Sequence, residues 1–303
     1  MNVSIIIVNY NVKDLVLQAL KSVFQYTSPN ISFEVIVVDN NSSDGSAEAI
    51  SKEFPEVILV RNENNSGFPQ ANNVGFKLAK GEYIFMLNPD TELIEDSIST
   101  LLKYCQSHPD LALIAPKLLN TDGSHQISAW RFPTITSIFA EMYYLNFFLK
   151  KKNYQDKDLT KPFEADSFSG AALFFSSKTL EQIGPLDEHL FWIEDIDFCY
   201  RIHLAGKSMH YVPSTSIIHH SGSSAKKSYV ISLSNQIFNK IKYFKKHHSP
   251  LSAQVVVIIS FLHSIQKWLL FSILSPFSFT ARLKRKAYAY TIPRVFNPPK
   301  GIR

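Results

Sequence analysis

The stretch Tyr83-Ile84-Phe85-Met86-Leu87-Asn88-Pro89-Asp90 decides the fold, because a hydrophobic run ends abruptly there in a proline and an acidic residue. A short apolar run bounded by turn signals is typical of a buried central strand. In open α/β sheets, ligands bind in the crevice outside the carboxyl ends of the strands. We therefore expect Asp90 to lie at a ligand crevice, where a carboxylate can hold a divalent cation against the phosphates of a nucleotide.

Strand-like and helix-like segments alternate through the first 120 residues, on both sides of this stretch. Such alternation predicts an α/β fold with a mostly parallel, doubly wound sheet and right-handed crossovers. The expected strands are Val3–Val8, Phe33–Val38, Val57–Val60, Tyr83–Leu87 and Leu111–Ala115, and the expected helices cover 13–26, 45–54, 68–80 and 94–107. A second ordered block follows at about 166–222, after an irregular stretch.

The length of 303 residues and the hydrophobic content of 45% allow one large core, or one domain with an appendage. We expect a domain over residues 1–225 and a helical appendage over 228–303. The two cysteines, Cys105 and Cys199, form no disulfide framework or metal knuckle, which favours a reducing compartment. The N-terminus runs straight into a strand pattern, so we expect no secretory signal.

The net charge of +5 conceals a sharp division, because the last acidic residue is Asp197. Residues 1–197 carry 26 Asp and Glu against 15 Lys and Arg, whereas residues 198–303 carry 16 Lys and Arg and no acid. An all-basic segment with interleaved aromatic residues implies an anionic partner. The segment is also strongly apolar, which favours an anionic membrane surface over nucleic acid.

Residues 251–274 form the most apolar part of this basic segment and are long enough to span a bilayer. A charged residue at mid-bilayer would cost about 2.5–3.5 kcal/mol, which disfavours spanning. We expect an amphipathic helix lying at the membrane interface, with packing against the protein's own domain as an alternative. Its narrow polar edge consists of Ser260, His263, Ser264, Gln266 and Lys267.

Two polar loops follow expected strands in the first half of the chain. Asp39 ends one strand and can accept hydrogen bonds from a nucleobase or ribose, whereas Asp44 is more simply a helix N-cap. In the second loop, Gly67 suits a positive-φ turn, and the side-chain amides and free N–H groups of the following helix can take a pyrophosphate. Asn and Gly are also generic turn residues, so this loop is a weak signal on its own.

Three carboxylates, Glu194, Asp195 and Asp197, stand within four residues among apolar neighbours. Adjacent acids in an apolar context indicate one raised pKa suited to proton abstraction. The alternative is a solvated acidic helix start favoured by the macrodipole. Further on, His219 and His220 end another short strand, where one of them could complete a metal site with Asp90.

No P-loop motif, Rossmann glycine fingerprint or Gly-x-Ser-x-Gly elbow is present in the sequence. In order along the chain, the motifs that are present resemble the inverting glycosyltransferases of family 2, which have the GT-A fold. Rhamnosyltransferase-like members that build bacterial cell-surface polysaccharides are the most similar in appearance. The resemblance covers roughly residues 1–225 and is carried by Ser4–Tyr10, Val38–Gly45, Asn65–Phe68 with Asn72-Asn73, Leu87–Asp90, Ser169–Ala171, Ile183–Glu188, Glu194–Asp197 and His219.

The resemblance implies a nucleotide-sugar half over 1–120, an acceptor half over 120–225, and a Mg²⁺ or Mn²⁺ cofactor. Asp90 matches the last Asp of the family's DXD metal motif, Asn88 replaces the first, and His219 is a second metal ligand. Asp195 matches the catalytic base, and Glu194 helps to orient the acceptor hydroxyl. The other implied site residues are Asn9, Tyr10, Asp39, Gly67 and Asn72 around the nucleotide, with Asn72 standing where many members have an arginine, and Trp192 and Gly170 on the acceptor side.

These assignments predict transfer of a sugar from a nucleotide diphosphate to a hydroxyl of a glycan or lipid-linked acceptor, at the cytoplasmic face of the membrane. The resemblance favours dTDP-rhamnose as donor and leaves UDP-sugars open. A sugar nucleotidyltransferase is the first alternative, although it would require a glycine-rich, basic loop where Asn9-Tyr10-Asn11 stands. A catalytically degenerate nucleotide-sugar-binding subunit is the second, since Asn88 replaces an acid. The sequence indicates no oligomeric state.

Overall fold

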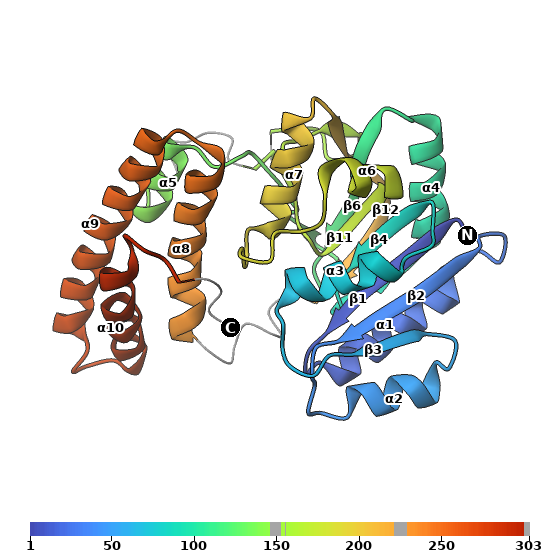
Figure 1. Cartoon of the computed structure of the whole chain (residues 1–303), viewed down its shortest axis with the longest axis horizontal. Coiled ribbons are helices and arrows are strands. Elements are labelled where there is room, and N and C mark those ends of the chain that lie inside the picture. Colours follow the sequence, from blue (N-terminus) through green and yellow to red (C-terminus); the bar gives the residue numbers. More distant parts are fainter. Residues whose placement is uncertain (146–152, 155, 221–228, 300–303) are drawn as a thin grey trace. The chain divides into compact units, whose positions relative to one another are not determined.

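The computed structural model describes residues 1–145, 153–154, 156–220 and 229–299. The chain divides into two compact units (Figure 1). The sheet unit comprises Met1–Phe132, Asn153–Asp187 and Glu194–Ser224, and the helical unit comprises Pro133–Lys152, Glu188–Ile193 and Ala225–Arg303. The expected domain boundary at 225–228 falls in a segment outside the described residues.

The expected strands and helices of the first 120 residues are all present, with ends that shift by a few residues. The described strands are β1 (Val3–Asn9), β2 (Phe33–Asp39), β3 (Ile58–Arg61), β4 (Tyr83–Leu87), β5 (Thr91–Leu93), β6 (Leu111–Leu119), β7 (His125–Gln126), β8 (Ala129–Trp130), β9 (Phe163–Glu164), β10 (Ser167–Phe168), β11 (Ala172–Ser176) and β12 (Ser208–His219). The helices of the sheet unit are α1 (Lys13–Tyr26), α2 (Ser46–Glu53), α3 (Phe68–Leu78), α4 (Ser97–Ser107), α6 (Ser177–Ile183) and α7 (Glu194–Leu204).

The main sheet has the order β3-β2-β1-β4-β11-β6-β12-β5, with β7 and β9 paired to β6 and β12. Strand β1 runs parallel to both β2 and β4, and β12 runs parallel to β6, which confirms the mostly parallel sheet. Strand β11 is antiparallel to β4, with Ala172 opposite Leu87. The carboxyl ends of β1, β2, β4 and β12 therefore lie at the same sheet edge as the amino end of β11. The sequence does not predict this antiparallel strand, because an apolar run carries no sign of its direction.

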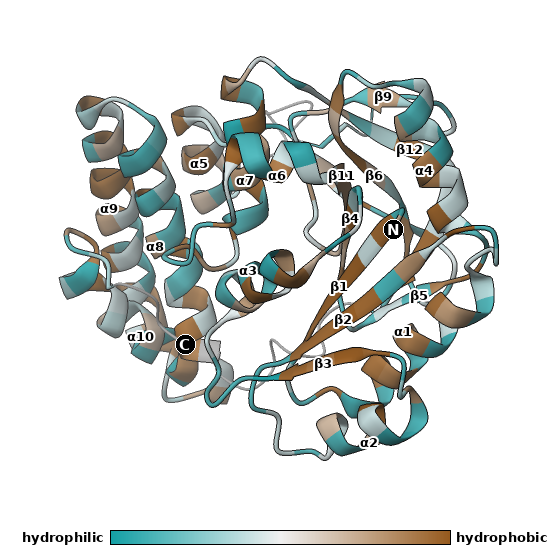
Figure 2. Ribbon diagram, turned by 45° about the vertical axis from the view of Figure 1, so that its right-hand side comes forward, coloured by the Kyte–Doolittle hydropathy of each residue, from teal (hydrophilic) through white to brown (hydrophobic). Residues whose placement is uncertain are grey.

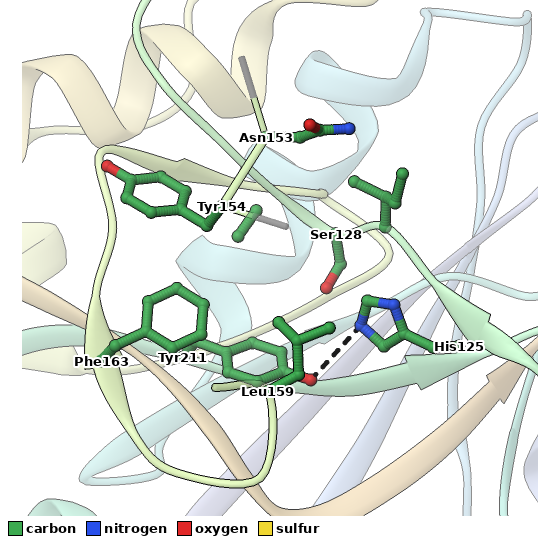
Figure 3. Close-up of a pocket in the computed structure, with 9 residues that line it drawn as sticks. His125, Ser128, Asn153, Tyr154, Leu159, Phe163 and Tyr211 are labelled. Carbon is green, nitrogen blue, oxygen red and sulfur yellow. Dashed lines mark hydrogen bonds between the residues drawn. The ribbon is translucent and has the colours of Figure 1, made fainter. Parts of the chain in front are cut away.

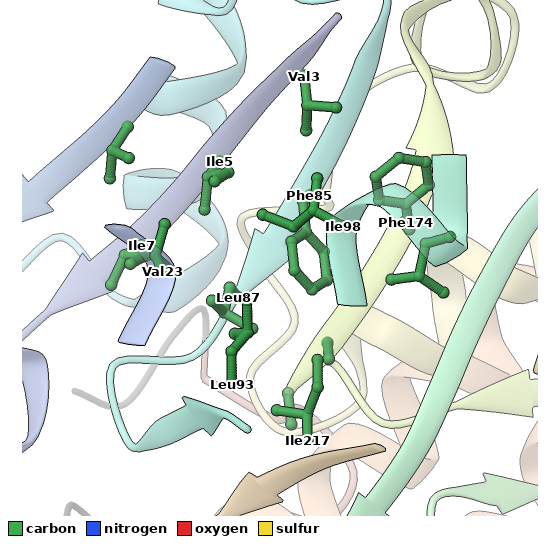
Figure 4. Close-up of a cluster of buried hydrophobic side chains, with 14 of the residues drawn as sticks. Val3, Ile5, Ile7, Val23, Phe85, Leu87, Leu93, Ile98, Phe174 and Ile217 are labelled. Carbon is green, nitrogen blue, oxygen red and sulfur yellow. The ribbon is translucent and has the colours of Figure 1, made fainter. Parts of the chain in front are cut away.

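Alternate side chains of the central strands build a core on each face of the sheet. Ile5 and Ile7 of β1, Phe85 of β4 and Phe174 of β11 lie in one fully buried cluster (Figure 4). On the other face, Gly75 lets α3 approach β1 closely, since a Cβ there would lie 2.5 Å from Cγ2 of Ile6. Strands β1–β3 are mostly hydrophobic, whereas α1 and α2 alternate in hydropathy as one-sided helices do (Figure 2). The core therefore holds the strand ends in place.

The helical unit consists of α5 (Ile135–Met142), α8 (Tyr229–His247), α9 (Pro250–Leu274), α10 (Phe279–Thr291) and the short 3₁₀ helix η3 (Ile292–Arg294). Three residues of the polar edge expected along 251–274 face inward, whereas Gln266 is exposed and Lys267 is half-buried. Ser260, His263 and Ser264 are buried, with Tyr143 and Tyr288 packed against the His263 ring. Large apolar residues cover much of the exposed side of α9. One face of α9 therefore packs against other helices of the same unit, and the exposed face carries many large apolar side chains.

Candidate active site

One edge of the sheet gathers the candidate residues from widely separated parts of the sequence. Asn9 and Asp39 are the last residues of the neighbouring parallel strands β1 and β2. Asp90 follows β4 at the same edge, and His219 ends β12 opposite Thr91 of β5. This convergence follows from the strand order, because parallel strands deliver their carboxyl ends to a common crevice.

The tips of β1 and β2 are tied together by the side chains of Asn9, Asp39 and Ser42. The Asn9 amide donates to Oδ1 of Asp39 at 2.7 Å and to Oγ of Ser42 at 3.0 Å. The other carboxylate oxygen of Asp39 accepts from the backbone N–H of Ser42 at 2.9 Å. Asp39 is thereby held rigidly, with both oxygens engaged, while the buried Oδ1 of Asn9 has no hydrogen-bond partner among the described residues. Tyr10, the next residue, is exposed and offers a ring on which a base can stack.

Asn40, which the sequence reasoning did not single out, holds the second polar loop against β2. Its buried side chain donates to Oδ1 of Asn65 and accepts from Asn62 and Ser66. Oδ1 of Asn65 also accepts from the N–H of Gly67, whose φ of +87° confirms the expected positive-φ turn. The geometry of this loop therefore depends on a network of side-chain amides, which residue types alone do not reveal.

Asn72 lies inside α3 and is almost completely buried. Its side-chain amide donates to the carbonyl oxygen of Phe68 at 3.0 Å, within the same helix. A contact between Asn72 and a nucleotide would require this amide to move. The neighbouring Asn73 exchanges two hydrogen bonds of 2.9 Å with the backbone of Leu186, which fastens the loop after α6 to α3.

Asp90 and His219 meet at the end of the sheet, as the metal-site prediction requires. Nε2 of His219 lies 3.3 Å from Oδ1 of Asp90. Strand pairing holds them there, since the N–H of His220 donates to the Asp90 carbonyl at 2.8 Å. Two adjacent ligands of an octahedral Mg²⁺ or Mn²⁺ ion lie about 3 Å apart when each bond is about 2.1 Å. The observed separation fits two ligands of one ion.

Gln126 of β7 orients His219 in a way the sequence did not suggest. Its Nε2 donates to Oδ1 of Asn120 at 2.9 Å and to the His219 carbonyl at 3.2 Å, so its Oε1 is the atom that faces Nδ1 of His219, at 2.7 Å. Nδ1 of His219 must then carry a proton, which in the neutral ring leaves the lone pair on Nε2. This is the tautomer that can bind a metal beside Asp90.

The residues present fit a divalent cation with oxygen-rich coordination. The buried Oδ1 of Asn88 has no hydrogen-bond partner in the described part of the chain, and such a neutral amide oxygen is a suitable cation ligand. Together with the Asp90 carboxylate and the His219 imidazole, it makes a donor set suited to Mn²⁺ or Mg²⁺. Within the described residues, no three His, Cys, Asp or Glu side chains are grouped closely enough to hold a metal by themselves.

Asp195 in the first turn of α7 is joined to the Asn88 side of the site by two consecutive residues. The N–H of Gly170 donates to Oδ2 of Asp195 at 2.9 Å, and the carbonyl of Ala171 accepts from the N–H of Asn88 at 2.9 Å. Burial raises the pKa of the Asp195 carboxyl, while the N–H donors of Gly170 and Ile196 oppose this shift. The structure thus places the proposed base close to the proposed metal ligands.

The other two carboxylates of the acidic cluster are also buried, but they differ in their surroundings. Asp197 accepts from Nε of Arg201 at 2.9 Å, and the same guanidinium donates to the carbonyls of Ile183, Gly184 and Pro185. Asp197 therefore serves the structure of this loop. Glu194 begins α7 next to Asp195. Trp192, in the helical unit, is 46% exposed with a φ of +77°, a strained conformation for a bulky residue that is typical of functional sites.

A small cavity lies in the 120–170 region, where the sequence pattern is least regular. Its volume is about 20 Å³, the size of one water molecule, and both polar and aromatic residues line it, among them His125, Ser128 and Tyr154 (Figure 3). On its wall, the Tyr211 hydroxyl lies 3.5 Å from Nε2 of His125. The buried Oγ of Ser128 has no hydrogen-bond partner among the described residues. The cavity is too small for a sugar and contains none of the candidate site residues.

This architecture, a mostly parallel sheet with polar groups at one edge, is that of an α/β protein with a GT-A-like fold. A mannosyltransferase from Pyrobaculum calidifontis, solved with GDP-mannose and Mn²⁺, superposes with a TM-score of 0.58 at 16% identity over 98% of this chain and 87% of its own. The Staphylococcus aureus TarS fragment gives a TM-score of 0.54 at 16% identity over 99% and 92%. These similarities establish the fold.

The family model described as glycosyl transferase family 2 matches residues 4–183, and the chain belongs to this family. The N-acetylglucosaminyl-diphospho-decaprenol L-rhamnosyltransferase of Mycobacterium tuberculosis is 27% identical over 205 residues, which are 61% of this chain and 66% of that protein. Rhamnosyltransferase WbbL of Escherichia coli is 25% identical over 228 residues, 72% and 83% of the two chains. For two further relatives, the chain spans only 20% and 37% of their length.

Proposed function

We propose that the chain is an inverting glycosyltransferase that moves a sugar from a nucleotide diphosphate to a hydroxyl of a glycan or lipid-linked acceptor. The observation that carries this proposal is the link between Asp195 and Asn88 through Gly170 and Ala171. This link joins a carboxylate with a raised pKa to the backbone of one proposed cation ligand, which supports a base and a leaving-group site in one crevice.

The reaction follows from these positions. The Asp195 carboxylate accepts the proton of the acceptor hydroxyl as that oxygen bonds to the anomeric carbon, while Glu194 orients the acceptor. The bond between the anomeric carbon and the diphosphate oxygen breaks with its electron pair going to the diphosphate, so the anomeric configuration inverts. Asp90, His219 and Asn88 would hold a divalent cation, which when bound neutralises charge on the diphosphate.

For the donor nucleotide, we assign contacts to the tips of β1 and β2. Tyr10 stacks on the base, and the rigid pair of Asn9 and Asp39 shapes the floor of the pocket for the base or ribose. We assign the diphosphate to the N-terminal end of α3, which follows Gly67, because the N-terminus of a helix attracts anions. The donor class is dTDP-rhamnose or a UDP-sugar.

For the acceptor, we propose a lipid-linked glycan met at the cytoplasmic face of the membrane, with Trp192 and Gly170 on the acceptor side. The mycobacterial relative is named for a decaprenol-linked acceptor, which supports this assignment. The helical unit adds support, because it carries 17 Lys and Arg against two Glu. Its helix α9 is the one helix in the described part of the chain that is long and apolar enough to cross a membrane, which by itself is weak evidence.

A two-part experiment tests the function. A panel of nucleotide sugars is screened by thermal shift with and without Mn²⁺, because a ligand of the folded state raises the melting temperature. The stabilising donor is then incubated with lipid-linked acceptors, and the product is analysed for transfer and anomeric configuration. Transfer with inversion is expected. Retention of configuration, pyrophosphate release from a nucleoside triphosphate with a sugar phosphate, or no turnover with any stabilising donor would refute the proposal.

A further inference from the structure

Helix α9 buries polar side chains beside apolar ones and exposes a row of large apolar residues. Its buried face includes Ser260, His263 and Ser264, and a stripe of aliphatic residues runs along the opposite face with spacings of seven and four residues. Because such spacings keep residues on one side of a helix, these side chains form a single line. Each is between 52% and 72% exposed, and the stripe consists of Leu251, Ile258, Leu262, Leu269 and Ile273.

Aromatic and basic residues continue the stripe at its C-terminal end. Phe277, in the turn after α9, and Phe279, at the start of α10, are among the most exposed large apolar residues of the chain. Arg282 and Lys286 share a helix face with Phe279, and Arg282 lies over the Phe279 ring at 5.9 Å. Exposed aromatic rings beside exposed cations are the pattern of side chains at a membrane interface.

We propose that this face, which we call the α9 stripe, lies flat on an anionic lipid bilayer, with Phe277 and Phe279 inserted and the cations of α10 at the lipid headgroups. The inference deepens the membrane association of the proposed function and rests on it. Charge complementarity selects the lipid surface over a second copy of the chain, because two copies meeting through this face would bring two strongly basic helical units together.

The buried face of α9 explains why the contact is in-plane. The inward hydroxyls and the His263 ring are packed against Tyr143 and Tyr288 of the same unit, with Nε2 of His263 3.5 Å from the Tyr288 hydroxyl. For α9 to span, it would have to separate from these neighbours or take α10 and its cations into the hydrocarbon. Both are strongly unfavourable. A one-sided contact leaves this packing intact.

The test uses the full chain with the paired substitutions Leu262→Gln and Leu269→Gln, which remove apolar surface without changing charge. Leu204→Gln is the matched control, because Leu204 is a similarly exposed leucine at the end of α7 in the sheet unit. Cosedimentation is measured with phosphatidylcholine vesicles that contain or lack phosphatidylglycerol. We expect the paired variant to bind anionic vesicles at least tenfold more weakly and the control to bind like the wild type. The triple variant Arg282→Gln, Arg285→Gln, Lys286→Gln should lose the preference for anionic vesicles.

The other outcomes are equally informative. Equal vesicle binding by the paired variant and the wild type would overturn the assignment of the face while leaving membrane association standing. No vesicle binding by the wild type would overturn both, whereas nucleotide-sugar transfer to a soluble acceptor tests the catalytic proposal independently. A wild type that sediments as a dimer without lipid, and a paired variant that sediments as a monomer, would identify a second copy as the occupant. Retention of the wild type in membranes after alkaline carbonate extraction would contradict the in-plane arrangement.

Discussion

The sheet unit and the helical unit place polar groups in opposite ways. The sheet unit holds acidic side chains such as Asp39, Asp90 and Asp195 at one sheet edge, each with hydrogen-bond or ion-pair partners. The helical unit buries neutral polar groups such as Ser264 and His263 and exposes leucines and cations. A buried charge requires hydrogen-bond or ion-pair partners, whereas a large exposed apolar surface is typical of an interaction site. The two units are therefore suited to chemistry and to docking, respectively.

The largest effect should come from Asp195→Asn, which tests the chemical side of this comparison. Removing the base should lower kcat by roughly 10²–10⁴-fold, while the donor, which does not depend on Asp195, binds as before. Single-turnover transfer and donor thermal shift measure the two quantities. Asp197→Asn is the comparison variant. It should lower the stability of the fold, because it disturbs the ion pair with Arg201, and it should leave the chemical step unchanged. Near-normal turnover of Asp195→Asn would contradict the base assignment.

The pH profile gives a second view of Asp195. Burial raises its pKa, and only the ionised carboxylate can accept a proton, so activity should be lost as the pH falls through the raised value. The acidic limb of kcat should therefore lie above the ordinary pKa of 3.8. A limb at or below that value would show that another group takes the proton.

His263 tests the same comparison in the helical unit through stability. Burial, aided by Lys267 and Lys240, lowers its pKa from 6.5 to about 4. Below pH 6.5 the unfolded chain takes up a proton that the folded chain excludes, so stability is complete above 6.5 and falls as the pH drops toward 4. The loss is up to about 3 kcal/mol. Chemical denaturation across this pH range should show that the free energy of unfolding falls less steeply for His263→Leu than for the wild type. The same dependence on pH in both proteins would contradict the burial of a neutral ring.

A smaller effect is expected from Gln126→Leu, which removes the acceptor that orients His219. Loss of such a partner should weaken Mn²⁺ binding by about 10–100-fold, measured by electron paramagnetic resonance without turnover. Gln126→Glu keeps an acceptor oxygen at the same position and should retain binding. If both variants bind Mn²⁺ like the wild type, His219 does not depend on Gln126 for its orientation.

The smallest effect should be on the stability of α9-stripe variants. Leu262→Gln should change the free energy of unfolding by less than about 0.5 kcal/mol, because the side chain at this position is exposed to water in the folded and in the unfolded chain. Val256→Ala, on the buried face of the same helix, should cost about 2 kcal/mol through a cavity. Comparable losses in urea denaturation would mean that the stripe packs against protein.

How much could be predicted from the sequence differs between the units for a physical reason. In the sheet unit, strands that end in polar residues give both the fold and the position of Asn9, Asp39 and Asp90, because strand ends and ligand crevices coincide. The roles of Asn40 and Gln126 depend on which amide meets which partner in space, and no residue pattern reports that. In α9, the spacing of residues shows that the helix has a polar side and an apolar side. It does not show which side is exposed to water.

In the proposed mechanism, the dipeptide Gly170-Ala171 is a fixed spacer between the proton acceptor and the side of the leaving group. Because Gly170 binds the Asp195 carboxylate and Ala171 binds the Asn88 backbone, two adjacent residues set the distance between the two sides of the site. A slip of β11 by one residue against β4 would turn its side chains to the opposite face and break both links together. Loops around this spacer can therefore change to suit other sugars and acceptors, while the length of the reaction path stays the same.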